Sequence, residues 1–336
     1  MNKNKLSYLL FIFFTLCWGC SSETEKRQNN RNNIVNVKDK IEEIVIEDVF
    51  IGQTARMFLT EKQLIIGDYM AVDEQIHLFD KNNYNYLACT APRGQGPDEI
   101  TIMGHIESVQ TNRIIYVSDH GKRKIFSYDL DSILANPQYK PTEKMKMESD
   151  LFPDRYQYIN DTLCIGTVIA PIGNSDYKPT VAKWNMLTGD IQPMKYEHPK
   201  IGKKRITFAA SMEYGIYVEC YSYHDLMTIC DLDGNLKYNI YGRNWNSRIS
   251  NSISHYRKAV FVKDKIFATY SGGNNSSDDE RFPTKFLVFE INGDYIKTIE
   301  TGYKICDFCY DQENNRIILN LDADKQFAYL NLAGII

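Results

Sequence analysis

The chain has 336 residues, a hydrophobic fraction of 43%, an aromatic fraction of 12% and a formal net charge of −4. Its 16 Phe and 23 Tyr exclude a chain that is disordered throughout, because disordered sequences are poor in aromatic residues. The slightly acidic charge argues against a strongly basic nucleic-acid-binding protein, so we expect no nucleic-acid partner. A single short apolar run excludes a protein with several membrane spans.

Residues 1–19 are predicted to be an export signal. Lys3 and Lys5 precede an apolar run over residues 6–16, which is too short to span a bilayer and is typical of a signal peptide. The sequence Cys17-Trp18-Gly19-Cys20 then resembles a bacterial lipobox. This resemblance implies cleavage before Cys20 and lipid attachment to its thiol. The alternative is a plain secretory signal with an incidental cysteine.

Residues 20–40 are predicted to be the lipidated cysteine and a flexible tether. The segment is polar, rich in Asn and nearly free of large hydrophobic residues, so it cannot offset the entropy cost of ordering. Glu23 and Glu25 resemble the acidic surface-export signal of Bacteroidota lipoproteins. The resemblance implies an outer membrane lipoprotein, either periplasmic or surface-exposed, that contacts the membrane through the lipid at Cys20.

Residues 41–336 are predicted to be a repeat domain. An apolar residue followed by Asp, Asn or Glu recurs at spacings of 41 to 59 residues. The six markers are Phe79-Asp80, Tyr128-Asp129, Trp184-Asn185, Cys230-Asp231, Phe289-Glu290 and Leu330-Asn331. A period of about 50 residues suits one four-stranded propeller blade, and no long apolar stripe of helical period follows Cys20. The sequence therefore predicts an all-β fold, a six-bladed β-propeller with four-stranded blades.

The ring must also close, because an open ring leaves an unpaired strand edge. An early strand is predicted over residues 41–49, without a complete blade of its own. We predict that this N-terminal strand completes the last blade, whose hairpin covers residues 316–332. The alternative is a seven-bladed ring in which residues 41–66 belong to a separate blade.

The sharpest local signature is RGQGPDEI, from Arg93 to Ile100. It resembles the G-x-G-P-x-E element of NHL-like, TolB-like six-bladed propeller lipoproteins of Bacteroidota. Residues 76–80 (IHLFD) and 125–129 (IFSYD) resemble the repeats of the same family. The resemblance covers most of the chain from about residue 41 and implies the fold and the lipoprotein address. It implies little about activity, because the activity of that family is largely undefined.

No motif identifies a catalytic residue, a metal site or a cofactor, and none is predicted. Cys306 and Cys309 form a lone C-x-x-C without the second ligand pair of a zinc site. Cys220 and Cys230 could face each other in a hairpin centred on Asp225, and we weigh a disulfide against two buried thiols, which we favour. The six His show no metal-ligand spacing.

Two classes of function stay open. The first is a monomeric binding or scaffolding propeller for a glycan, peptide or protein partner, and we favour it because no nucleophile motif occurs. The alternative is a metal-dependent lyase or hydrolase with converging His and carboxylates in the channel. The predicted binding residues are Arg93 and five residues expected to end the inner strands of their blades: Asp68, Asp119, Tyr221, Tyr270 and Asp322.

Overall fold

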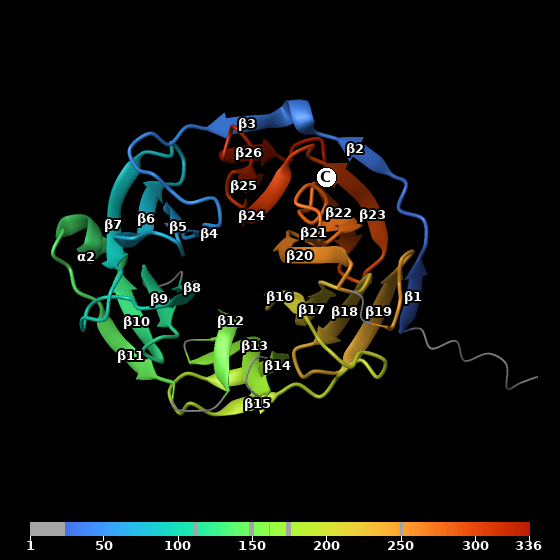
Figure 1. The fold of residues 1–336 in the computed structure, drawn as a ribbon, viewed down its shortest axis with the longest axis horizontal. Helices are drawn as coiled ribbons and strands as arrows, with labels where there is room; N and C mark the ends of the chain where they lie inside the picture. Colours follow the sequence, from blue (N-terminus) through green and yellow to red (C-terminus); the bar gives the residue numbers. More distant parts are fainter. Residues whose placement is uncertain (1–23, 110–112, 148–150, 161, 173–175, 249–250) are drawn as a thin grey trace, which may run out of the picture.

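The computed structural model describes residues 24–336 except 110–112, 148–150, 161, 173–175 and 249–250. Six sheets stand in a ring around a central channel, which confirms the predicted all-β, six-bladed propeller (Figure 1). The helical elements in this part of the chain are a short 3-10 helix, η1 (Lys38–Lys40), and one short α-helix, α2 (Leu130–Ala135). No helix within the described residues is long and apolar enough to cross a membrane.

In each blade the four strands run from the channel outward. Blade 1 contains β4 (Arg56–Leu59), β5 (Gln63–Gly67), β6 (Glu74–Asp80) and β7 (Tyr86–Pro92). Blade 2 contains β8 (Met103–Val109), β9 (Ile114–Asp119), β10 (Lys124–Asp129) and β11 (Thr142–Lys146). Blade 3 contains β12 (Phe152–Tyr158), β13 (Leu163–Ile172), β14 (Asp176–Asn185) and β15 (Ile191–Pro193).

The second half of the ring repeats this order. Blade 4 contains β16 (Ile206–Ser211), β17 (Ile216–Tyr221), β18 (Leu226–Asp231) and β19 (Leu236–Gly242). Blade 5 contains β20 (Ile253–Val262), β21 (Lys265–Asn274), β22 (Lys285–Glu290) and β23 (Tyr295–Glu300). Blade 6 contains β24 (Lys304–Asp311), β25 (Arg316–Asp322), β26 (Phe327–Asn331) and β3 (Ile41–Ile44).

The six sequence markers all end the third strand of a blade. In blades 1 to 5 the polar member of the marker starts the connection to the fourth strand, whereas in blade 6 the fourth strand, β3, comes from the N-terminal part of the chain. In blade 1, Oδ1 of Asp80 accepts from the backbone N–H of Asn82 at 2.8 Å and of Asn83 at 3.1 Å. In blade 3, Oδ1 of Asn185 accepts from the N–H of Leu187 at 2.9 Å. An Asp or Asn recurs at this point because its side chain replaces a backbone acceptor in a tight turn.

The N-terminal strand β3 closes the ring, as predicted. It pairs antiparallel with β26, with Ile41 opposite Leu330 and Ile44 opposite Phe327. Ile41 and Ile44 are both buried, so the strand contributes to the core as well as to the backbone ladder. The seven-bladed alternative is wrong, because residues 41–44 belong to blade 6 and residues 56–67 belong to blade 1.

The segment expected to be a flexible tether is ordered in two places. Strand β1 (Glu25–Gln28) adds in parallel to β19, and β2 (Ile34–Asn36) adds in parallel to β23, at the outer rim of the ring (Figure 1). The tether prediction is wrong for these residues because edge strands offer free backbone groups, and pairing with them needs no apolar side chains. Residues 1–19 and Cys20 lie outside the described part, so the signal peptide and lipidation stay predictions.

The antiparallel order divides the loops of every blade between two faces of the ring. The loops between second and third strands and the links between blades lie on one face, which we call the upper face. The loops between first and second strands, and between third and fourth strands, lie on the lower face. Packing between neighbouring blades is apolar, as between Phe286 of blade 5 and Phe308 of blade 6, whose ring centroids are 4.9 Å apart.

Candidate binding site in the central channel

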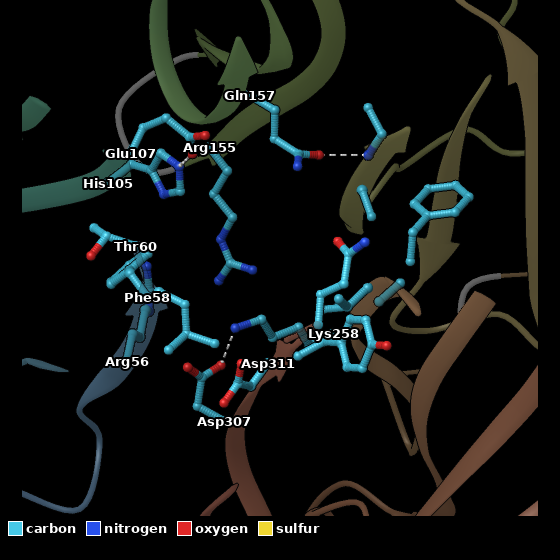
Figure 2. Close-up of a pocket in the computed structure, with 18 of the residues that line it drawn as sticks. Arg56, Phe58, Thr60, His105, Glu107, Arg155, Gln157, Lys258, Asp307 and Asp311 are labelled. Carbon is cyan, nitrogen blue, oxygen red and sulfur yellow. Dashed lines mark hydrogen bonds and ion pairs between the residues drawn. The ribbon is translucent and has the colours of Figure 1, made fainter. Parts of the chain in front are cut away.

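A cavity of about 840 Å³ follows the channel from its middle to the lower face. The innermost strands of all six blades line it, and its volume is typical of a small-molecule site. Its middle is unusually rich in polar side chains for the inside of a β-protein (Figure 2). Those that carry the argument below are Arg56, His105, Glu107, Arg155, Lys258 and Asp307.

Irregular strand pairing brings four of these side chains to the channel. The pairing register shifts between Met103 and Ile106 in β8, between Pro153 and Arg155 in β12, between Tyr256 and Ala259 in β20, and between Ile305 and Asp307 in β24. His105, Arg155, Lys258 and Asp307 lie within or directly after these shifts. Over their described residues, the pairs β4–β5 and β16–β17 show no shift. A β-bulge redirects a side chain, and bulges are common beside functional sites.

Lys258 and Asp307 form an ion pair across neighbouring blades. The Nζ of Lys258 lies 2.7 Å from Oδ1 of Asp307, and the backbone N–H of Met57 donates to the other carboxylate oxygen at 2.7 Å. The Thr269 hydroxyl accepts from the N–H of Lys258 at 3.0 Å, which holds the bulge in β20. The carboxylate of Asp307 is therefore already used by the fold on both oxygens.

Arg155 is a cation in the middle of the channel cavity. Figure 2 shows its guanidinium and the ammonium of Lys258 pointing into the middle of the cavity. With the residues that the structure describes, this guanidinium forms no hydrogen bond or ion pair. Burial and the positive charge of Arg56 lower the pKa of Arg155. The carboxylates of Asp154 and Asp307 act against this lowering, and a bound anion would stabilise the half-buried guanidinium further.

Arg56 lies beside Arg155 and is better compensated. Its guanidinium carbon is 4.5 Å from the centre of the Tyr69 ring. Burial acts to lower the pKa of Arg56, but Tyr69 and the carboxylates of Asp307 and Asp154 outweigh burial and raise it. The three cations Arg56, Arg155 and Lys258 thus face two carboxylates, Asp307 and Asp154.

His105 and Glu107 do not supply the missing negative charge. The Nε2 of His105 lies 3.0 Å from Oε2 of Glu107 and 2.9 Å from the carbonyl oxygen of Tyr156. Burial, with the positive charge of Arg155, lowers the pKa of His105 to about 3, and burial raises the pKa of Glu107 well above its ordinary value. His105 is therefore neutral near pH 7, with Nε2–H donating to the Tyr156 carbonyl, and burial favours the neutral form of the Glu107 carboxyl.

A second cavity of about 370 Å³ opens on the upper face between blades 3 and 4. Arg56 and Arg155 line this cavity as well as the channel cavity. Its outer wall contains Tyr177 and Tyr223, and Tyr177 is 43% exposed. Arg205 lies 4.1 Å from the centre of the Tyr177 ring and donates to Oδ1 of Asp176 at 2.6 Å. The two guanidiniums therefore lie where the cavities meet.

The residues predicted from sequence lie elsewhere. Asp68, Asp119, Tyr221 and Asp322 lie at or directly after the upper ends of second strands, and Tyr270 lies within β21, also a second strand. The expectation that they end the innermost strands is wrong, since the innermost strands precede them in each blade. Neither of the two cavities described above is lined by any of them or by Arg93.

The predicted carboxylates act within the fold. Asp119 is fully buried and accepts from the backbone N–H groups of Thr101 at 2.8 Å and Gly121 at 2.9 Å. Asp68 accepts from the N–H of Gly52 at 2.7 Å, which ties the link from blade 6 to blade 1. Asp322 accepts from the side chain of Gln53 in the same link.

The other predicted side chains also have local partners. The hydroxyl of Tyr221 donates to Glu219 at 3.0 Å, and that of Tyr270 donates to Asp225 at 3.1 Å. Arg93 is exposed and donates to the carbonyl oxygen of Ala71 at 2.9 Å. No ligand tests these six residues, so their role in binding stays a prediction.

The cysteines and histidines form no recognisable centre in the described residues. The hairpin around Asp225 is present, but Cys220 lies opposite Met227 and Cys230 opposite Tyr217, and both thiols are free and buried. The disulfide alternative is therefore wrong. No group of three or more His, Cys, Asp or Glu side chains that could hold a metal ion occurs among the residues described.

The channel residues were not predicted from the sequence, because the predicted binding residues were sought at strand ends and turns. A usable signal was present: charged residues interrupt the innermost strands, as in the sequences DRYQY of β12 and HYRKAVF of β20. Charges within a strand that should pack between blades indicate a side that faces a polar space. Which charges converge could not be known without the register shifts.

Comparison with known proteins supports the fold. A family model described as a 6-bladed beta-propeller, DUF5128, matches residues 28–162. A structure of a DUF4221 family member from Bacteroides vulgatus is similar at 14% identity and a TM-score of 0.58, covering 87% of this chain and 98% of that chain. No curated protein matches the chain.

Two further structures are similar at the level of fold. One is described as an exported protein from Bacteroides fragilis, with 10% identity, a TM-score of 0.57 and coverage of 89% of this chain and 88% of that chain. The other is a luciferin-regenerating enzyme, with 8% identity, a TM-score of 0.56 and coverage of 86% and 94%. At these identities the likeness concerns the fold alone. The finer resemblance to NHL-like and TolB-like lipoproteins stays a prediction.

Proposed function

We propose that this chain is a cell-envelope lipoprotein, anchored at Cys20, whose propeller binds the acidic group of a glycan, peptide or protein partner in its channel. The observation that carries the proposal is Arg155, a cation inside the channel with no partner among the described residues. A guanidinium suits this role because its donors match the two oxygens of a carboxylate or phosphate.

The surroundings of Arg155 favour an anion over other ligands. Arg56 and Lys258 add positive charge, His105 is neutral near pH 7, and burial disfavours the negative charge of Glu107. Inside a channel the screening by water is reduced, so each charged hydrogen bond counts for more than at the surface. An incoming carboxylate would add a third negative charge to a group of three cations that faces two carboxylates.

The proposed location has separate support. The apolar run over residues 6–16 and the cysteine after it fit an exported, lipid-anchored protein. One similar structure belongs to a protein described as exported, from Bacteroides fragilis. Among the described residues, no cluster of side chains supports the metal-dependent lyase or hydrolase.

The proposal is tested by thermal unfolding of the purified protein with a panel of small ligands. The panel contains galacturonate, inorganic phosphate, an acidic peptide and, as a neutral control, galactose. A bound ligand at 100 times its Kd stabilises the folded state by about 2.7 kcal/mol. We expect at least one acidic ligand to raise Tm, galactose to leave it unchanged, and the shift to shrink with added salt. No shift with any acidic ligand would overturn the proposal.

A further inference from the structure

The channel cavity and the upper-face cavity meet at the same two side chains. Arg56 and Arg155 line both, so an acidic group held by these guanidiniums has free volume on both sides. Toward the lower face lies the channel, and toward the upper face lies the space between blades 3 and 4. A ligand with one small acidic group would occupy only the junction and leave the second cavity unfilled.

The wall of the second cavity is unlike that of the channel. It combines two tyrosine rings, Tyr177 and Tyr223, with the hydroxyl groups of Ser222 and Thr167 and the carboxylate of Asp154. Few aliphatic residues line it, and these are Ile169, Pro179 and Ile206. Flat aromatic faces beside polar acceptors suit a ligand that is itself polar at its edges and apolar on its faces.

Tyr177 is held in place for such a contact. Arg205 packs on its ring at 4.1 Å and also donates to its carbonyl oxygen at 2.9 Å. Asp176 fixes the other end of the guanidinium at 2.6 Å, and Lys203 lies 2.9 Å from the second oxygen of Asp176. The ring is 43% exposed despite these contacts, so one face is braced while much of the side chain stays accessible.

We infer that the ligand is an acidic oligosaccharide that spans both cavities. The carboxylate of a hexuronate residue would bind Arg155 and Arg56, and the next sugar would pack on Tyr177 and Tyr223. Sugar rings present C–H groups on their faces and hydroxyls at their edges, which matches the mixed wall of the second cavity. This inference rests on the proposed function, because it places the acidic group at the same guanidiniums.

An acidic peptide fits the second cavity less well. Peptide recognition commonly takes its specificity from pockets for individual side chains, including apolar ones. The aliphatic part of this wall is small, and charged and hydroxyl-bearing residues make up most of the rest. The wall of the second cavity therefore favours an oligosaccharide over an acidic peptide.

Calorimetric titration of the full purified protein distinguishes these cases. The probes are galacturonate, its dimer and trimer, neutral galactobiose and a short polyglutamate peptide. We expect affinity to rise at least tenfold from galacturonate to its trimer. We expect Tyr223→Ala and Tyr177→Ala each to lower affinity for the trimer by about tenfold, while affinity for the monomer is unchanged. Phe50→Ala is the matched control, since Phe50 is 92% exposed in an upper-face link outside both cavities and its loss should change neither affinity.

The outcomes separate the two claims. If galacturonate and its trimer bind with equal affinity, and the tyrosine variants leave both affinities unchanged, the oligosaccharide inference is overturned. The anion site would still stand. Tighter binding of polyglutamate than of the trimer would overturn it in favour of a peptide. Absence of binding by every acidic probe would overturn both the inference and the proposed function. Circular dichroism of each variant shows whether a loss of affinity comes from misfolding.

Discussion

The upper ends of the second strands and the middle of the channel are both polar, but they differ in how far the fold itself satisfies them. Asp119 accepts hydrogen bonds from four backbone N–H groups, those of Thr101, Ile102, Gly121 and Lys122. The guanidinium of Arg155 bonds to no described residue. A polar side chain whose hydrogen bonds are all made within the protein stabilises the fold. A side chain with unused hydrogen-bond donors or acceptors is available to a ligand.

The largest expected effect on stability comes from removing a carboxylate whose oxygens are hydrogen-bonded within the fold. Asp119→Ala leaves several backbone N–H groups near a fully buried position without an acceptor. We expect the free energy of unfolding to fall by about 3 kcal/mol, because each unsatisfied group costs about 1–3 kcal/mol. Asp119→Asn keeps one acceptor oxygen and should lose less. Urea denaturation measures both, and a loss under about 1 kcal/mol for Asp119→Ala would contradict the structural role.

The raised pKa of Glu107 leads us to expect a pH dependence of stability. Because its pKa is raised in the folded state above the ordinary 4.5, the folded state keeps a proton that the unfolded state has lost. Its contribution is fully present below pH 4.5 and is lost as pH rises toward the folded pKa, at about 1.4 kcal/mol per pH unit. Glu107→Gln removes this pH-dependent contribution to the free energy of unfolding.

We therefore expect Glu107→Gln to gain stability relative to the parent protein as the pH rises from about 5 to about 7. Urea denaturation at both pH values measures the gain. A difference between variant and parent that does not change with pH would show that Glu107 is ionised in the channel. That result would weaken the case for an uncompensated Arg155.

Replacing Arg155 should stabilise the empty protein. Arg155→Gln keeps a polar, though shorter, side chain and removes a half-buried charge that forms no ion pair with the described residues. We expect a gain of about 1 kcal/mol in the free energy of unfolding, since sites kept for function commonly cost stability. Denaturation without ligand measures this. A clear loss of stability would mean that Arg155 serves the fold, as Asp119 does.

The smallest effect is expected at Arg93. This side chain is exposed and bonds to the carbonyl oxygens of Tyr69 and Ala71 at its surface. Arg93→Gln should change the free energy of unfolding by no more than about 0.5 kcal/mol, as is usual for surface substitutions. It should also leave the binding of every probe unchanged, which titration would check.

The fold could be predicted because each blade repeats one local requirement. Asp80, Asn185 and Asp231 recur because the same turn needs a side-chain acceptor, and this need is visible in the sequence. The parallel addition of β1 and β2 could not be predicted, because it depends on backbone groups of distant edge strands and on contacts such as Lys26 with Asp294 and Arg31 with Asp225, which sequence periodicity does not show.

The candidate site was not predictable for a related reason. Asp119 and Arg155 both stand at strand positions where a polar residue is either a structural acceptor or a ligand contact. The difference lies in backbone N–H groups around Asp119 and in the register shift before Arg155, neither of which the sequence shows. The charged interruptions in the innermost strands indicated a polar channel, but they did not show which charges meet there.

In the proposed function, Arg155 in the channel, and not Arg93 on the upper face, binds an acidic ligand. The most direct test compares the Kd of an acidic probe, trigalacturonate, for Arg155→Gln and Arg93→Gln in the same buffer. We predict that Arg155→Gln raises the Kd by about 10- to 100-fold, the effect of losing a charged hydrogen bond, while Arg93→Gln leaves it within about twofold. Equal effects of the two variants, or a larger effect of Arg93→Gln, would contradict the account.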